Sequence, residues 1–262
     1  MPSASPLRNI PNLFTLLNLF FGCCAIVFTL QTEPINVIQG DARITIFNIP
    51  ESLYLASICI GIAAVIDFLD GFLARLFNAA SDMGKQLDSL SDVVSFGAAP
   101  AMILYQFLRI AYTREENGLD VSIAWLMPAF LFACAGAWRL ARFNIDQSQS
   151  FHFKGVPIPA AGLVVASLPL IAWYDYFDGS INDILFKKWF LYALILVLAY
   201  LMISKLPMIA LKFKDRDIKS NMPKIILLVI ALVSAVLLKW LAVPVVFIAY
   251  ILVSLTLKNQ KA

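Results

Sequence analysis

The chain has 262 residues, of which 61% are hydrophobic and 14% are charged, and its formal net charge is +3. Average soluble domains carry roughly 25% charged residues, so this composition excludes an ordinary soluble protein and favours membrane-spanning helices. The small net charge, and the lack of a basic helix with interleaved aromatic residues, argue against nucleic-acid binding.

Apolar runs recur along the whole chain, and each of about eight is close to the ~20 residues that a helix needs to cross a bilayer. The last two runs are separated only by Lys239 and Trp240, so we expect them to form a tight helical hairpin. The expected spans cover residues 12–30, 52–75, 87–109, 123–143, 157–174, 188–206, 223–239 and 241–257.

Two connections between the expected spans are long. Residues 31–51 should form an ordered loop or a short interfacial element, and residues 207–222 should form a second loop. No repeat or linker divides the chain. We therefore expect an all-α, polytopic transmembrane bundle that forms a single integral-membrane domain over residues 1–262.

The Lys and Arg residues are distributed unevenly between alternate loops. The side that holds the N-terminus collects fourteen of the twenty. The positive-inside rule then places both termini in the cytoplasm of a multi-pass protein of the cell membrane. The stretch 67–92 falls at the cytoplasmic end of the second and third spans, where soluble and membrane-embedded substrates can meet.

Four aspartates in this stretch follow helical spacing. Asp67 and Asp70 are three residues apart and share one helix face, and Asp88 and Asp92 are four apart on the next helix. Charges in apolar segments are costly and usually functional. Two facing helices with two carboxylates each would form the all-oxygen site that Mg²⁺ or Mn²⁺ prefers. The alternative is a set of solvated carboxylates at helix ends.

Small residues and an arginine accompany the aspartates. Gly71, Ala74 and Gly84 leave room for a bulky group to approach the backbone, and Arg75 offers a planar fork that can pair with phosphate. Cations beside an arginine are suited to binding a diphosphate. The residues alone therefore predict metal-assisted phosphoryl transfer, in which a carboxylate takes a proton from an attacking hydroxyl.

The spacing D-x2-D-G-x2-A-R-x8-G-x3-D-x3-D resembles the signature of the CDP-alcohol phosphotransferase family. Its fixed positions here are Asp67, Asp70, Gly71, Ala74, Arg75, Gly84, Asp88 and Asp92. The resemblance implies that Asp67, Asp70 and Asp88 hold a pair of divalent cations. It also implies that Asp92 is both the general base and a metal ligand.

The same resemblance implies a donor site, a fold and an assembly. Gly71, Arg75 and Ser81 match positions that contact the cytidine diphosphate part of the donor. The fold would be a six-helix core, often homodimeric, which here covers about residues 8–206 and is followed by a C-terminal helical hairpin at about 223–257.

The first span opens with Pro11-Asn12-Leu-Phe-Thr15, which resembles the P-N-x-x-T start of the family. Asn12 and Thr15 are three residues apart and would face the nucleotide. The alternative for Asn12 is an N-terminal helix cap. The residues expected to bind the donor are thus Asn12, Thr15, Gly71, Ala74, Arg75, Ser81 and Gly84.

Segments later in the chain give information on which acceptor the protein uses. Arg139 and Arg142 share a face near the cytoplasmic end of the fourth span. They either snorkel to the membrane surface or bind an anionic group, such as an acceptor carboxylate or a donor phosphate. The run R-L-A-R-F-N that contains them resembles the phosphatidylserine synthase branch of the family. The G-x-P-x-P-A-A run at 155–161 and the run 201–205 share this resemblance.

This resemblance implies transfer of the phosphatidyl group of CDP-diacylglycerol to the hydroxyl of serine, with release of CMP. Alternative acceptors within the family are glycerol 3-phosphate and an inositol. A divalent-cation transporter is disfavoured, because the aspartates cluster at one membrane end and no paired broken helices occur. A non-catalytic lipid-binding scaffold is the remaining alternative.

Overall fold

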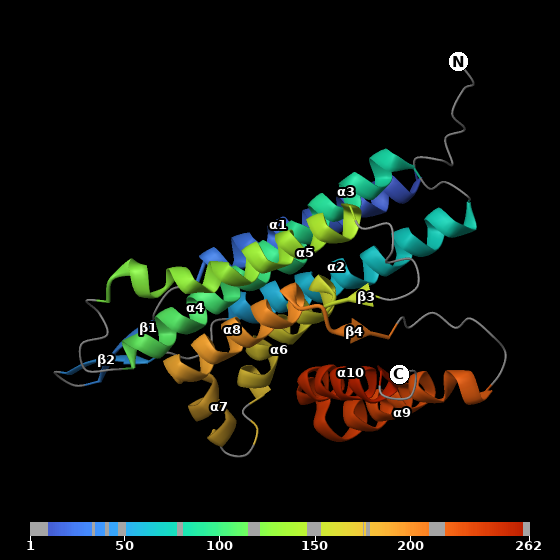
Figure 1. The fold of residues 1–262 in the computed structure, drawn as a ribbon. Helices are drawn as coiled ribbons and strands as arrows, with labels where there is room; N and C mark the ends of the chain where they lie inside the picture. Colours follow the sequence, from blue (N-terminus) through green and yellow to red (C-terminus); the bar gives the residue numbers. More distant parts are fainter. Residues whose placement is uncertain are drawn as a thin grey trace.

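The computed structural model describes residues 10–32, 35–39, 42–46, 51–77, 81–114, 121–145, 153–174, 176, 179–209 and 218–258. Long helices dominate these residues (Figure 1). They are α1 (Ile10–Leu30), α2 (Glu51–Leu76), α3 (Asp82–Asp92), α4 (Ala99–Thr113), α5 (Leu131–Ile145), α6 (Ile158–Tyr174), α8 (Lys188–Ile203), α9 (Ile218–Leu238) and α10 (Ala242–Lys258).

Shorter elements connect these helices. The helical ones are a π-helix η2 (Val93–Ala98), three 3₁₀ turns η4 (Ile123–Trp125), η5 (Met127–Phe130) and η7 (Lys239–Leu241), and α7 (Ser180–Leu185). Two antiparallel ribbons pair β1 (Ile35–Gln39) with β2 (Ala42–Ile46), and β3 (Phe153–Lys154) with β4 (Pro207–Met208).

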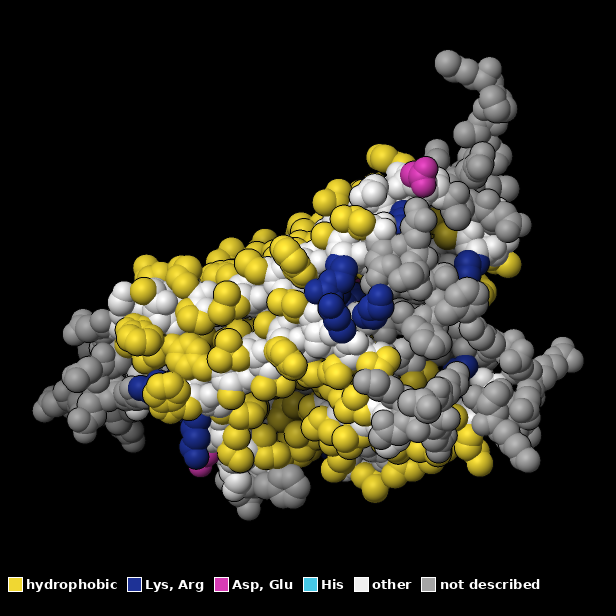
Figure 2. All heavy atoms as spheres, viewed as in Figure 1, with side chains coloured by type: hydrophobic (Ala, Val, Ile, Leu, Met, Phe, Trp, Pro, Cys, Tyr) yellow, Lys and Arg dark blue, Asp and Glu magenta, His cyan; other side chains and the backbone are white. Residues whose placement is uncertain are grey.

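Five helical runs are long and apolar enough to cross a membrane, and α6 and α8 are shorter apolar helices. The runs are Pro11–Leu30, Glu51–Leu76, Asp82–Thr113, Ile123–Ile145 and Asn221–Thr256, the last of which covers most of α9 and of α10. The expected all-α, polytopic membrane fold is confirmed. Hydrophobic side chains cover much of the surface drawn in Figure 2, as a lipid-facing surface requires.

Several element boundaries differ from those expected from the apolar runs. The third expected span starts earlier, at Asp82, because the Ser81 Oγ accepts a hydrogen bond of 3.0 Å from the Gly84 N–H and caps the helix. In α9 the helix starts at Ile218, before the apolar run, and α8 ends at Ile203. The first long connection contains the β1–β2 ribbon, and α7 is an additional short helix.

Helix α1 turns polar and small side chains inward and large apolar ones outward. Thr15, Asn18 and Thr29 are buried on its inner face, whereas Leu13 and Phe20 are exposed on the other. Figure 1 shows the start of α1, the end of α2 and the start of α3 at the same end of the bundle. Because a lipid-facing surface is apolar, this inverted pattern brings polar groups into the interior.

Serine hydroxyls attach α1 to the third span. Ser91 Oγ donates to the Thr15 carbonyl and Ser95 Oγ donates to the Asn18 carbonyl, each at 3.0 Å. Gly22 permits this close packing, because a Cβ atom there would lie 2.8 Å from the Ser95 Cα. Hydrogen bonds from serine hydroxyls, together with small residues, thus hold α1 close to α3 and η2.

The π-helix η2 interrupts an otherwise continuous helix. Pro100 lacks an N–H and would clash with the carbonyl four residues earlier, and the Ala99 N–H reaches back five residues to the Val94 carbonyl. A Cβ atom on Gly162 would lie 2.9 Å from the Phe96 carbonyl, so α6 packs directly on this widened turn. The junction of α3 and η2 is therefore fixed against α6.

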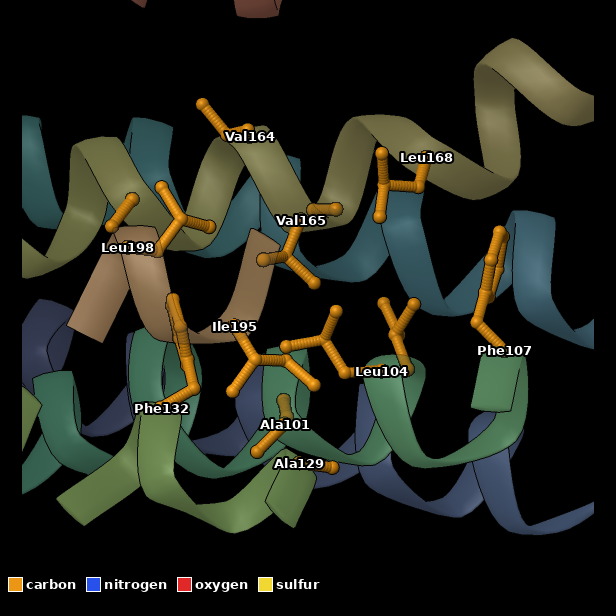
Figure 3. Close-up of a cluster of buried hydrophobic side chains, with 14 of the residues drawn as sticks. Ala101, Leu104, Phe107, Ala129, Phe132, Val164, Val165, Leu168, Ile195 and Leu198 are labelled. Carbon is orange, nitrogen blue, oxygen red and sulfur yellow. The ribbon is translucent and has the colours of Figure 1, made fainter. Parts of the chain in front are cut away.

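The apolar core lies where α4, α5, α6 and α8 meet (Figure 3). Helix α6 is buried along most of its length, which places it at the centre of the bundle. The labelled core residues are Ala101, Leu104, Phe107, Ala129, Phe132, Val164, Val165, Leu168, Ile195 and Leu198.

The C-terminal helices α9 and α10 form the expected hairpin, with η7 at its turn. Figure 1 shows the pair side by side, and α10 contacts α6 and β4. A cavity of about 550 Å³, with mostly apolar walls, lies between α6 and the two helices of the hairpin. On α9, Val236 is 80% exposed, which suits a surface that faces lipid.

Candidate active site

The four aspartates of the predicted site come from the end of α2 and from α3. Helical spacing puts Asp67 and Asp70 on one face of α2, and Asp88 and Asp92 on one face of α3. Carboxylate oxygens of Asp67, Asp70 and Asp88 all lie within 4.8 Å of one another. We refer to these four residues as the aspartate cluster. The sequence predicts that the carboxylates on α2 face those on α3, and the structure brings these two helix faces together.

Helix α1 supports the aspartate cluster from one side. Thr15 Oγ1 donates a hydrogen bond of 2.7 Å to Asp70 Oδ2, and the Pro11 carbonyl lies 3.1 Å from the same hydroxyl. Both Thr15 and Asp70 are buried. A charge-assisted hydrogen bond in a buried place fixes the orientation of the carboxylate.

Asp92 lies one helical turn after Asp88 on α3. It is buried at the last position of α3, immediately before η2. It interacts electrostatically with Asp67, Asp88 and Asp70, and it is attracted by Arg139. Its Oδ1 atom has no hydrogen-bond partner within the described part of the chain.

The aspartate cluster has the ligands that a hard divalent cation requires. Its donors are all carboxylate oxygens, and three of the four side chains converge closely enough to share an ion. Without a cation, the like charges would repel one another, and a buried carboxylate oxygen without a partner would be costly. The residues present therefore fit Mg²⁺ or Mn²⁺.

A cavity of about 240 Å³ lies beside the aspartate cluster and collects most of the predicted donor-binding residues. It is bounded by the start of α1, the end of α2 and the start of α3. Its lining residues are Pro11, Asn12, Thr15, Asp70, Gly71, Ala74, Ser81, Gly84, Lys85 and Asp88. Residues predicted from two separate motifs thus surround a single space.

Asn12 and Gly84 meet across this cavity. A Cβ atom on Gly84 would lie 3.0 Å from the Asn12 Oδ1 and 3.1 Å from the Ser81 Oγ. Helix α1 already begins at Ile10, so the alternative that Asn12 caps the helix is wrong. The side chain of Asn12 points towards α3 instead.

Among the residues that were predicted to bind the donor substrate, Arg75 alone is absent from the lining of this cavity. Its Nη1 atom lies 3.8 Å from the place that a Cβ atom on Gly71 would occupy. The guanidinium therefore folds back over the small residue one turn earlier, beside the cavity wall. Gly71 leaves the space that this arrangement uses.

The two arginines of α5 have different environments. Arg139 is buried, with 8% of its surface exposed, and its Nε atom has no hydrogen-bond partner within the described residues. It is attracted by Asp92, and Tyr250 of α10 lies in its surroundings. Arg142 is half-buried, and its Nη1 atom donates a hydrogen bond of 2.8 Å to the Ile203 carbonyl at the end of α8.

The later motifs that were singled out from the sequence are in contact. The Gly155 N–H donates to the Leu206 carbonyl at 2.8 Å, and the Val156 N–H donates to the Leu201 carbonyl at 3.1 Å. Gly155 has a φ of +78°, and a Cβ atom there would lie 2.9 Å from the Ser204 carbonyl, so glycine is required. The start of α6 is thereby joined to the end of α8.

Some residues of this region were not predicted. Asn18 is fully buried on α1, one turn beyond Thr15, and neither of its amide atoms has a partner within the described residues. The three-residue spacing of Asn12, Thr15 and Asn18 is a signal that would have found it. No sequence motif marks Lys85, which lines the cavity beside the aspartate cluster, or Tyr250 of the hairpin.

The chain is similar to a known protein family and to several known proteins. The family model for CDP-alcohol phosphatidyltransferase matches residues 8–201. A CDP-diacylglycerol–serine O-phosphatidyltransferase from Helicobacter pylori is 33% identical over 253 residues, which cover 95% of this chain and 90% of that relative.

Two further relatives match over shorter lengths. A protein of the same name from Bacillus subtilis is 42% identical over 103 residues, covering 39% of this chain and 53% of the relative. The archaetidylserine synthase of Methanothermobacter thermautotrophicus is 32% identical over 148 residues, covering 56% of this chain and 59% of that relative. Because the family model spans most of the sequence and includes the aspartate cluster, this chain belongs to the CDP-alcohol phosphatidyltransferase family.

Proposed function

We propose that this protein transfers the phosphatidyl group of CDP-diacylglycerol to the hydroxyl of L-serine, forming phosphatidylserine and CMP. The observation that carries the proposal is the convergence of the Asp67, Asp70 and Asp88 carboxylates beside a cavity lined by the family's donor-site positions. The serine as acceptor is supported by the name of the Helicobacter pylori relative, which aligns with 95% of this chain.

The family depends on divalent metal ions, and the aspartate cluster provides the ligands for them. We assign a pair of ions, Mg²⁺ or Mn²⁺, to Asp67, Asp70, Asp88 and Asp92. Such ions neutralise a diphosphate and stabilise negative charge on a departing phosphate oxygen.

Asp92 is the general base in this scheme. Its buried, unpartnered Oδ1 takes the proton from the serine hydroxyl. The serine oxygen then forms a bond to the phosphorus that carries diacylglycerol, and the bond from that phosphorus to the CMP oxygen breaks. Arg75, beside the cavity wall, pairs with the diphosphate of the donor.

The donor occupies the cavity between α1, α2 and α3. Its nucleotide and diphosphate need close approach to the backbone, which the small side chains on α2 and α3 permit. The residues that we assign to donor binding are Asn12, Thr15, Gly71, Ala74, Arg75, Ser81 and Gly84. The lipid chains extend from this site into the bilayer.

Arg139 and Arg142 are proposed to serve an anionic group of a substrate. Arg139 is near Asp92, so it has access to the reacting groups. Arg142 is half-buried and donates a hydrogen bond to the Ile203 carbonyl, and its remaining donors would bind an acceptor or a lipid phosphate.

The site is proposed to face the cytoplasm together with both termini, on the basis of the Lys and Arg bias. A soluble acceptor then reaches the aspartate cluster from water while the donor arrives from the membrane. We further propose that residues 1–262 form a single domain, with a core over about 8–206, and that the protein is a homodimer like other members of the family.

An acceptor panel tests the proposal. Purified protein in detergent, with CDP-diacylglycerol and Mn²⁺ or Mg²⁺, should release CMP when L-serine is added. It should not do so with glycerol 3-phosphate or inositol. CMP release with one of these other alcohols, and none with serine, would change the acceptor but keep the chemistry. Metal flux into proteoliposomes without CMP release would favour a transporter.

A further inference from the structure

The cavity between α6 and the C-terminal hairpin is separate from the cavity beside the aspartate cluster. Its volume of about 550 Å³ falls within the ~300–1,000 Å³ that is typical of ligand pockets. Residues of α6, α9 and α10 line it, whereas the cavity beside the aspartates is bounded by α1, α2 and α3. The two cavities share no residue among those that the structure describes.

The walls of this cavity are suited to a hydrocarbon chain. Apart from Lys224 and Tyr250, every described lining residue has an apolar side chain. Cavities with apolar walls do not hold water, because a buried water needs polar partners. Protein interiors are also closely packed, and voids much larger than a water molecule are rare in them. An apolar occupant is therefore the ligand that these walls favour.

The cavity reaches from the packed interior to the lipid-facing surface of the hairpin. Leu228 lines it and is 55% exposed, whereas its neighbour Leu227, which also lines it, is 6% exposed. Both leucines belong to the apolar run Asn221–Thr256, which is long enough to cross a membrane. A chain from the surrounding bilayer can thus enter sideways, beside Leu228.

The extent of the cavity matches the depth of a single lipid leaflet. Its lining on α9 runs from Lys224 to Ala231, which is about 10 Å along a helix, and its lining on α10 runs from Ala242 to Tyr250, about 12 Å. One leaflet contributes roughly half of the ~30 Å hydrocarbon core of a bilayer. The cavity therefore accommodates most of one acyl chain from one leaflet.

Lys224 gives one end of the cavity a positive charge. It lies in the second turn of α9, at the end of the hairpin away from the turn η7, and it is half-buried. Its Nζ atom donates a hydrogen bond of 3.0 Å to the Asn221 Oδ1, which holds the ammonium group at this end. A lysine close to a membrane surface attracts anionic lipids, so the charge complements a lipid headgroup.

We propose that this cavity binds an acyl chain of an anionic glycerophospholipid from the surrounding bilayer, with the lipid phosphate at Lys224. This lipid is distinct from the CDP-diacylglycerol donor, because the cavity that we assign to the donor lies between other helices. The residues of α9 and α10 that line the site also lie beyond the region 8–201 that the family model matches.

The bound chain fills the space between the hairpin and α6. Helix α6 packs directly on the π-helix η2 through Gly162, and its start is joined to the end of α8. A lipid in the cavity therefore connects the hairpin to the central helix of the bundle. Because a ligand that binds only the folded state stabilises it, lipid binding should also raise the temperature at which the protein unfolds.

The first test measures lipid selectivity without any substrate. The full-length protein, purified and delipidated in detergent, is titrated with phosphatidylglycerol or with phosphatidylcholine of the same acyl chains, and native mass spectrometry counts the bound lipids. Phosphatidylglycerol should bind about 5-fold more tightly, the effect expected of one lysine near a lipid headgroup. Lys224→Gln should bring the ratio close to 1. Lys205→Gln is the matched control, because Lys205 is exposed after α8 and is not a lining residue, and it should retain the preference.

The second test locates the lipid. Phosphatidylglycerol with a photoreactive diazirine in its acyl chain should label peptides of α6, α9 or α10 that line the cavity. Ala231→Trp places an indole in the cavity and should abolish this labelling. Val236→Trp is the matched control, because Val236 lies on the same helix, is 80% exposed and does not line the cavity. It should be labelled like the wild-type protein.

Three results would overturn the inference. Labelling confined to other helices would place the lipid elsewhere, and equal affinities for the two lipids, or an unchanged preference in Lys224→Gln, would remove the role of the charge. A higher KM for CDP-diacylglycerol in Ala231→Trp, with an unchanged KM for serine, would assign the cavity to the donor. Failure of the proposed function is distinguishable, because lipid binding is measured without donor or acceptor. Lys224→Gln keeps the test decisive if Ala231→Trp does not fold.

Discussion

Thr15 on α1 donates a hydrogen bond of 2.7 Å to Asp70 on α2, although 55 residues separate them in the chain. This bond couples the first helix of the protein to the carboxylates at the end of the second. It also joins two separate sequence motifs, the P-N-x-x-T start and the aspartate signature, in one structural unit.

Removal of that bond should weaken metal binding. In Thr15→Val the side-chain shape is kept, but Asp70 loses its donor, and partners of metal ligands are typically worth about 10- to 100-fold in metal affinity. The Mn²⁺ concentration for half-maximal activity should therefore rise by roughly that factor. Thr29→Val is the matched control, because Thr29 is buried on the same helix and its hydroxyl donates to the Ala25 carbonyl, far from the aspartates in sequence. Equal Mn²⁺ requirements in the two variants would contradict the assignment.

Asp88 is a predicted metal ligand on α3. Asp88→Ala should abolish transfer, with a loss of about 10³-fold or more, because an incomplete ligand set cannot hold the ions that stabilise the departing phosphate. Direct Mn²⁺ binding, followed by electron paramagnetic resonance, should be weakened in parallel. The exposed Asp82 at the start of the same helix provides the control Asp82→Ala, which should remain active. Normal turnover of Asp88→Ala would exclude it as a ligand.

Gly84 is predicted to set the width of the donor cavity. An alanine Cβ there would lie 3.0 Å from the Asn12 Oδ1, tighter than ordinary contacts, so Asn12 must move. We expect Gly84→Ala to raise the KM for CDP-diacylglycerol by about 10-fold, a size typical of small steric changes in a substrate site. Gly61→Ala is a suitable control, since nothing lies within 4 Å of its added Cβ. If both variants have the same donor KM, the cavity is not the donor site.

Gly162 controls the packing of α6 on the π-helix that follows Asp92. In Gly162→Ala the new methyl group would lie 2.9 Å from the Phe96 carbonyl, a backbone atom that cannot easily move. Overpacking of this kind costs about 1–3 kcal/mol. Thermal unfolding in detergent should begin at a lower temperature than for wild type, again with Gly61→Ala as the control. An unchanged unfolding temperature would mean that α6 and η2 are packed less tightly than this 2.9 Å contact indicates.

The aspartate cluster was predictable because helical spacing acts locally. Asp67 with Asp70, and Asp88 with Asp92, must share faces in any helix, and a cation explains why the two faces meet. The helical hairpin was predictable for a similar reason, since only two residues separate its apolar runs.

Other features depend on distant contacts. The π-helix has a local cause in Pro100, but its position is also shaped by α6, which packs on Phe96 through Gly162. Tyr250 is one of several aromatic residues in an apolar helix, and only the folded chain brings it near Arg139. The different environments of Arg139 and Arg142 likewise could not be read from their three-residue spacing, because they depend on the positions of α8 and α10.

The most direct test of the central claim measures both products of one reaction. Purified protein, CDP-diacylglycerol, radiolabelled L-serine and Mn²⁺ should yield CMP and labelled phosphatidylserine in equal molar amounts, and removal of Mn²⁺ with a chelator should abolish both. Release of CMP without incorporation of serine into lipid, or serine incorporation that persists without divalent cations, would contradict the account.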